Sequence, residues 1–268
     1  RLGWKHFGDA GIHASVAPES AEGQAARRQL AIGVLALVGL AGSVAILVRQ
    51  GVLSVEAVTS AFSWVYLIVV IAFFTWLFMA GQWTKEERKR LIVIVVLFAG
   101  AAVFWSAFEQ AASTLNLFAA QNTRNSIFGW TFPSSWFQSV NALMIIIFAP
   151  VFAWIWISLG KRDPSSPAKF AFGLVSVGLG FVVMVGAAQA SANGVLVSPM
   201  WLVLTYLLHT IGELSLSPVG LSSMTKLAPD RVKGMMMGVW FLAASVGNLI
   251  AGGVLRFYAD FTLPQVFG

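Results

Sequence analysis

The chain has 268 residues, of which 58% are hydrophobic and only 10% charged, and its mean hydropathy is +0.80. These proportions exclude a soluble domain, whose surface needs more polar side chains. They indicate an all-α polytopic membrane protein, because an isolated strand cannot satisfy its backbone hydrogen bonds in lipid. The net charge of +6 does not indicate nucleic-acid binding, since the basic residues sit in short loops between apolar runs.

Seven apolar runs are long enough to cross a bilayer as helices, which takes about 20 residues each. They cover residues 31–49, 60–81, 91–117, 136–160, 169–190, 198–224 and 234–257. The first thirty residues are polar and mixed in charge, unlike a signal peptide. We therefore expect the numbering to begin inside a longer protein.

The loops between these runs carry an uneven distribution of Lys and Arg, which predicts the orientation of the chain. Residues 1–30 and the loops at 82–90, 161–169 and 226–233 would lie on one side, and they hold all but three of these residues. The three on the opposite side are Arg49, Arg124 and Arg256. By the positive-inside rule the chain starts in the cytoplasm and ends outside.

The first two runs contain no ionisable residue in their interiors and are predicted to form a peripheral, lipid-facing hairpin. Among all seven runs, the only acidic residues are Glu109 and Glu213. An ionised carboxylate inside a membrane costs several kcal/mol unless it is paired, protonated or facing water. These two residues are therefore the first candidates for function.

Polar residues recur at helical spacing in the later runs. Thr205, His209, Glu213 and Ser217 are four residues apart, which predicts one shared face, and Pro218 predicts a bend after it. The run at 91–117 carries a comparable stripe beside Trp105, which consists of Ser106, Glu109, Gln110, Ser113 and Asn116. The next run carries a shorter stripe near its outer end, which consists of Gln138 and Asn141.

The last run carries small residues four apart, a spacing that permits close helix contact. They are Gly234 and Gly238, then Ala243, Gly247 and Ala251. Trp240 lies between the two groups. Spacing leaves open whether its indole anchors the helix in lipid or forms a wall of a cavity.

Two stretches go beyond general membrane patterns: FWSAFEQAAS at 104–113 and GELSLSPVGLSSMTKLAPDRVKGMMMGVWFLAASVGN at 212–248. They resemble the proton-coupled oligopeptide transporters, a branch of the major facilitator superfamily. WFQSVNALMIIIFAPVFAWIW at 136–156 and the opening RLGWKHFGDAG are similar to further parts of that family.

The resemblance implies a domain organisation. Residues 1–30 would be a cytoplasmic segment between two bundles, 31–81 the two-helix transmembrane hairpin of bacterial members, and 82–268 a partial carboxy-terminal bundle with core helices seven to eleven. The amino-terminal six-helix bundle and the final helix would be absent from this chain. The family's ExxER string on its first helix does not occur in the sequence.

The resemblance also implies proton-driven symport of di- and tripeptides into the cell by alternating access. It implies a multi-pass protein of the bacterial inner membrane that acts as a monomer when complete. The proton would be the coupling ion, with no other cofactor.

The same resemblance assigns roles to the acids and amides. Glu213 would bind the peptide ammonium; its alternative is pairing with a basic residue of the absent half. Glu109 would be the proton-coupling acid, since desolvation favours a protonated carboxyl, and its alternative is a permanently paired structural acid. Asn141 would contact the peptide backbone, with Gln138 a weaker candidate for that contact. Ala142 departs from the family, in which Pro commonly follows the asparagine.

Trp105, Ser217 and Trp240 match positions that line the family's binding pocket, where indoles would receive apolar side chains. Packing is the alternative for each. Gln110 would orient Glu109 by hydrogen bonding. His209 could tune Glu213 from one turn away, although a satisfied interior histidine is the more common case.

Two other functions stay open at this stage. A related transporter could carry nitrate, a drug or a peptide-like compound, and a membrane receptor or scaffold would not transport at all. No metal-ligand spacing, catalytic Ser, His and Asp set or phosphate loop occurs, so the sequence does not indicate an enzyme or a metal site.

Overall fold

The computed structural model describes residues 21–79, 81–258 and 260–268. Its internal contacts divide the chain into two units, the first ending at Ile68 and the second beginning at Val69. Within the described residues, seven helical segments are long and apolar enough to cross a membrane, which confirms the seven predicted spans.

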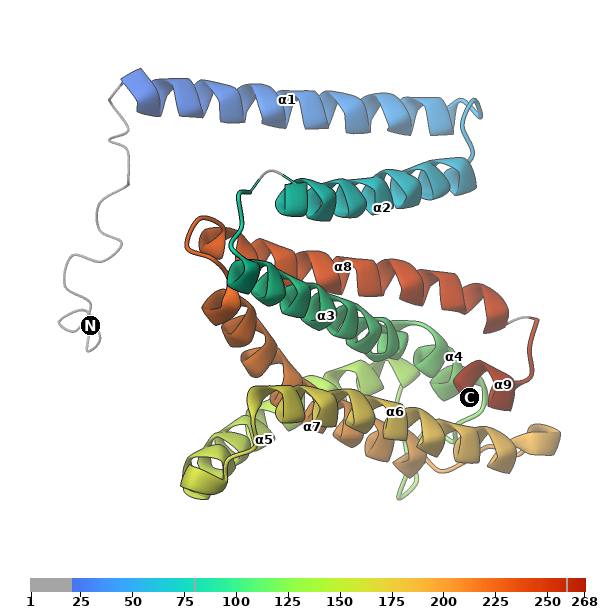
Figure 1. Cartoon of the computed structure of the whole chain (residues 1–268). Coiled ribbons are helices and arrows are strands. Elements are labelled where there is room, and N and C mark those ends of the chain that lie inside the picture. Colours follow the sequence, from blue (N-terminus) through green and yellow to red (C-terminus); the bar gives the residue numbers. More distant parts are fainter. Residues whose placement is uncertain (1–20, 80, 259) are drawn as a thin grey trace, which may run out of the picture. The chain divides into compact units, whose positions relative to one another are not determined.

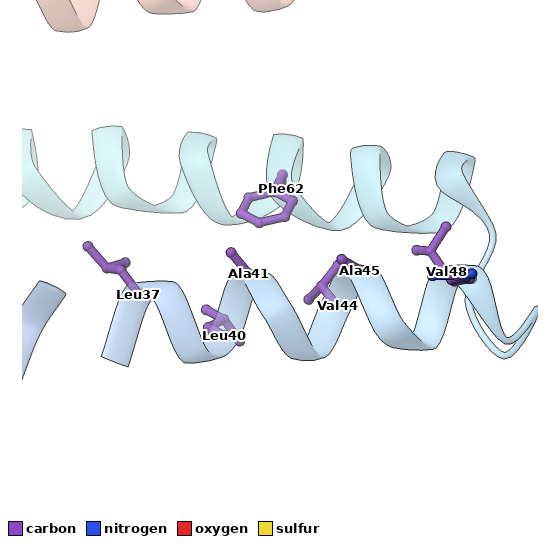
Figure 2. Close-up of a pocket in the computed structure, with 8 residues that line it drawn as sticks. Leu37, Leu40, Ala41, Val44, Ala45, Val48 and Phe62 are labelled. Atoms are coloured by element: carbon purple, nitrogen blue, oxygen red, sulfur yellow. The ribbon is translucent and has the colours of Figure 1, made fainter. Parts of the chain in front are cut away.

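The first unit contains α1 (Ala21–Arg49) and the first half of α2 (Val55–Met79), joined by a turn in which Gly51 has a positive φ of 73°. The most apolar 18-residue window of α1 has no buried residue, as expected for a helix that faces lipid. Phe62 of α2 points toward α1, and together they enclose an apolar groove of about 710 Å³ (Figure 2).

The helix α1 begins ten residues before the predicted start of its span. Residues 21–30 of the expected cytoplasmic segment therefore belong to a helix, and residues 1–20 lie outside the described part of the chain. The helix starts earlier because good helix formers such as Ala, Gln and Arg precede its apolar run. The expected domain boundaries at 30 and 81 stay predictions.

The second unit is a helical bundle with a small strand hairpin (Figure 1). Its helices are α3 (Lys85–Phe108), α4 (Thr114–Gln121), α5 (Phe137–Leu159), α6 (Ser166–Ala190), α7 (Met200–Leu227), α8 (Met236–Val254) and α9 (Leu263–Phe267). Between α4 and α5, β1 (Ser126–Ile127) pairs antiparallel with β2 (Trp130–Thr131). Short 3₁₀ turns cover Glu109–Ala112, Ser134–Trp136, Gly160–Arg162, Ala192–Gly194, Lys233–Met235 and Leu255–Tyr258.

Local sequence signals place the ends of these helices. Thr84 accepts a hydrogen bond from Glu87 N (3.2 Å) and its own N–H donates to Glu87 Oε2 (2.8 Å), a capping box that starts α3. Pro218 lies inside α7, which continues past it and changes direction along its length (Figure 1). The predicted bend in this span is consistent with that path, because proline removes a helical hydrogen bond.

Glycines allow the closest helix contacts in the bundle. On α6, a Cβ added to Gly173 would lie 2.6 Å from Leu216 Cβ and 2.8 Å from Gly212 O of α7. On α8, a Cβ on Gly247 would lie 2.6 Å from Trp105 Cβ, which confirms close contact in the second small-residue group. In the described residues, nothing lies within 4 Å of a Cβ at Gly234 or Gly238. That first group therefore makes no such contact here.

We expect Gly173→Ala to destabilise the bundle by about 1–3 kcal/mol, because neither backbone nor Cβ atoms can move aside for the added methyl group. The thermal unfolding midpoint of the purified full-length protein in detergent should fall. Gly178→Ala in the same helix is the matched control, since nothing lies within 4 Å of its Cβ position among the described atoms. Equal midpoints for the two variants would contradict the proposed contact.

Candidate functional site

The span that carries Glu109 is broken at that residue. The helix α3 ends at Phe108, a 3₁₀ turn covers Glu109–Ala112, and α4 starts at Thr114 after Ser113, whose φ and ψ are −120° and −97°. A 3₁₀ stretch inside a helix commonly marks a hinge or strain. The helical span predicted over 91–117 is present, but it is interrupted by this turn. Nothing in the sequence indicated the break, which contains neither Pro nor Gly.

Glu109 is half-buried and opens this turn. Its carboxylate forms no hydrogen bond or salt bridge with any other residue in the described ranges. The two salt bridges found there, Lys89–Glu86 and Lys169–Asp163, lie at loops and helix ends. The partner that a permanently paired acid would need is not in this part of the chain.

Gln110 does not orient Glu109 by hydrogen bonding, which corrects the role expected from the sequence. Its Nε2 donates to Ser106 O (3.2 Å) and Ala251 O (3.4 Å). Its Oε1 accepts from Ser113 Oγ and Thr114 Oγ1, both at 2.9 Å. These four bonds use the full capacity of the amide, so none is left for Glu109.

Asn141 and Glu213 are brought together although they lie on different helices. Asn141 Nδ2, on α5, donates to Glu213 Oε2 on α7 at 3.4 Å and to Thr210 Oγ1 at 3.0 Å. Glu213 and Asn141 are both partly exposed. The structure thus forms a polar cluster of Asn141, Thr210 and Glu213, here called the α5–α7 cluster.

The predicted stripe on α7 divides into two parts. Thr205 donates to Gly180 O of α6 (3.3 Å), and the His209 ring lies against Gly180, where an added Cβ would be 2.7 Å from Nε2. Glu213 instead meets Asn141 of α5. The stripe therefore faces two neighbouring helices, since four residues advance an α-helix by about 40° more than one turn.

His209 is buried, and neither ring nitrogen has a hydrogen-bond partner within the described part of the chain. Its ring lies 5.4 Å from that of Phe181 and 6.0 Å from that of Phe108. The structure shows no bond from His209 to Glu213. The histidine is therefore not placed to tune Glu213 through a direct contact.

The remaining candidates occupy different environments. Trp105 is half-buried and packs edge-on against Phe108 at 5.2 Å. Trp240 is only 4% exposed, and its ring lies 2.4 Å from the position of a Cβ on Gly220, so it packs between α7 and α8. Ser217 Oγ is buried without a partner among the described residues. Gln138 is exposed, one turn before Asn141.

Two residues at the site were missed by sequence reasoning. Thr210 belongs to the α5–α7 cluster, and Tyr206 OH donates to Ala111 O in the 3₁₀ turn (3.3 Å). Tyr206 and Thr210 are four residues apart on α7, and Thr210 also donates to Tyr206 O (2.8 Å). Their spacing of four residues was the available signal, but neither side chain carries a charge at neutral pH that would mark it as costly in a membrane.

The arrangement places one carboxylate on the 3₁₀ turn and another in the α5–α7 cluster. Both are accessible in part, within a membrane-spanning bundle. Carboxylates in such a setting can attract a cationic group or bind a proton.

A family model described as "POT family" matches residues 2–267. The chain belongs to the POT family. It is 46% identical over 225 residues to the peptide transporter YePEPT of Yersinia enterocolitica, covering 82% of this chain and 44% of the relative. It is 34% identical to a di-/tripeptide transporter of Lactococcus lactis subsp. cremoris, covering 75% and 41%.

A solved structure supports the same conclusion for the fold of this POT family chain. The crystal structure of a peptide transporter POT in complex with sulfate superposes with a TM-score of 0.82 and 38% identity, covering all of this chain and 54% of that one. The family resemblance and the transporter-type helical fold expected from the sequence are thus confirmed. The chain spans about half the length of the relatives that it matches.

Proposed function

We propose that the protein carrying this chain imports di- and tripeptides by proton-driven symport. The α5–α7 cluster supports the peptide part of the proposal. Asn141 holds one carboxylate oxygen of Glu213, and the other, Oε1, has no partner among the described residues. An oriented carboxylate with one free oxygen suits the ammonium that every short peptide carries.

Glu109 is the proposed proton site. It stands at the 3₁₀ turn, half-buried, with no partner in the described chain. A carboxyl in such surroundings binds a proton from one side and releases it when its environment changes. A membrane potential adds about 2.3 kcal/mol per charge per 100 mV to the driving force.

The remaining candidates are proposed to form the walls of the peptide site. Trp105 and Ser217 are proposed to line the pocket, with Trp240 behind them and Gln138 at its outer edge. A complete transporter would act as a monomer in the bacterial inner membrane, with the proton as its coupling ion and without a cofactor. The amino-terminal bundle would supply the facing half of the site.

The experiment is peptide-dependent proton uptake by the full-length protein in proteoliposomes. Dialanine and trialanine should each carry protons inward with them, whereas free alanine should not. N-acetylated dialanine is the matched control, because it keeps the backbone and removes the ammonium. Equal proton uptake with alanine and with dialanine would refute the proposal, and so would proton uptake with nitrate but not with peptides; either result would indicate another solute. No proton uptake with any of these solutes would favour a receptor or scaffold.

A further inference from the structure

We propose that Gln110 is a positioning residue for proton coupling: its side-chain amide maintains the 3₁₀ turn that carries Glu109 and ties that turn to α8. The inference rests on the proposed function of Glu109. It concerns a residue that touches neither the proton nor the peptide. Gln110 is 3% exposed, so no ligand reaches it in this structure.

The amide nitrogen of the Gln110 side chain lies where the chain changes from the α-helix α3 to the 3₁₀ turn. The α-helical bonding of α3 ends with the N–H of Glu109, which donates to Trp105 O. The next carbonyl, that of Ser106, accepts from Gln110 Nε2. The side chain thus supplies a donor to a carbonyl at the point where the backbone switches to 3₁₀ bonding, seen in the Ser113 N to Gln110 O bond of 3.1 Å.

The acceptor half of the amide lies where the next helix begins. Gln110 Oε1 accepts from the hydroxyls of Ser113 and Thr114, the residues at the start of α4. One side chain therefore connects the end of α3, the turn and the start of α4. Without this side chain, a continuous α-helix would compete better with the 3₁₀ turn. The rotation per residue would then change from about 120° in the 3₁₀ turn to about 100° in the α-helix, which would redirect every side chain of the turn.

The turn is also tied to both neighbouring helices. Gln110 Nε2 donates to Ala251 O on α8, and Tyr206 OH of α7 donates to Ala111 O. Tyr206 in turn accepts from Thr210 of the α5–α7 cluster through its carbonyl. The position of Glu109 is thereby connected to α7, which carries Glu213, and to α8, through hydrogen bonds that a change in helix packing would strain.

The test uses Gln110→Met in the full-length protein, because methionine keeps the length of the side chain and removes all four hydrogen bonds. Proteoliposomes report two rates per folded transporter: peptide uptake driven by an imposed proton gradient, and peptide counterflow without a gradient. We expect driven uptake to fall by about tenfold or more, as displaced reacting groups commonly cause, while counterflow stays near that of the native protein. The external pH for half-maximal driven uptake should also shift.

Gln189→Met is the matched control, since Gln189 is an exposed residue of α6 at the end of the helix. It should leave both rates and the pH profile unchanged. Unchanged driven uptake in Gln110→Met, or a fall of both rates by the same factor, would overturn the proposal. Failure of the native protein to transport peptide would instead refute the proposed function, so the two failures are distinguishable.

A second variant keeps the test decisive if Gln110→Met does not fold. Ser113→Ala with Thr114→Val leaves Gln110 in place and removes both hydroxyl donors to its Oε1. We expect the same separation of driven uptake from counterflow, to a smaller extent. A double variant that matches the native protein in both rates and in its pH profile would refute the positioning role.

Discussion

Glu109→Gln is expected to abolish uphill accumulation of peptide while peptide counterflow continues. The amide resembles a permanently protonated carboxyl in shape and charge, so the substrate site persists and only the exchange of a proton is lost. We expect driven uptake to fall by about 100-fold, within the range typical of lost acid–base groups. Uptake and counterflow of labelled dialanine in proteoliposomes measure the two activities separately.

Glu56→Gln is the matched control for this experiment. Glu56 is an exposed acid in the first turn of α2, so its charge has no part in the proposed site. It should transport as the native protein does. Accumulation of peptide by Glu109→Gln against a gradient, to the native level, would show that another group carries the proton.

Glu213→Gln is expected to weaken peptide binding itself. The variant loses a charged acceptor for the peptide ammonium, and hydrogen bonds to charged groups contribute about 1.5–3 kcal/mol. The dissociation constant for dialanine should therefore rise by roughly tenfold to a hundredfold. Equilibrium binding to the purified full-length protein measures it directly.

A peptide analogue without the amino group makes this test specific. The native protein should prefer dialanine to its desamino analogue, and Glu213→Gln should lose most of that preference. A variant that weakens binding of both ligands equally would indicate a structural effect of Glu213. If Glu109→Gln and Glu213→Gln both accumulated peptide normally, the assignment of the site would be wrong.

Several features of this protein were predictable because they depend on neighbouring residues alone. The seven spans follow from the length of each apolar run, and the start of α3 follows from Thr84 and Glu87. Glu109 and Glu213 were selected because a carboxylate inside an apolar run is costly wherever the run lies. The close contact at Gly247 followed from its spacing with other small residues.

The features that were missed depend on residues distant in sequence. The role of Gln110 required Ala251, 141 residues away, and the α5–α7 cluster required Asn141 to meet Thr210 across 69 residues. Nothing in the sequence indicated that the stripe on α7 meets two helices: successive positions four apart turn by about 40° around the helix, so Thr205 contacts α6 and Glu213 contacts α5.

The sequence by itself determined that the chain crosses a membrane as helices, which intramembrane residues carry charge, and which family the chain resembles. Those properties are set by local hydrophobicity and by residue identity. Only the tertiary structure decided where the helix that carries Glu109 breaks and that Asn141 donates a hydrogen bond to Glu213. It also decided that Gln110 forms hydrogen bonds with residues on both sides of the break rather than with Glu109. The reason is physical: a hydrogen bond between helices depends on how they pack, and no periodicity along one helix specifies its partner on another.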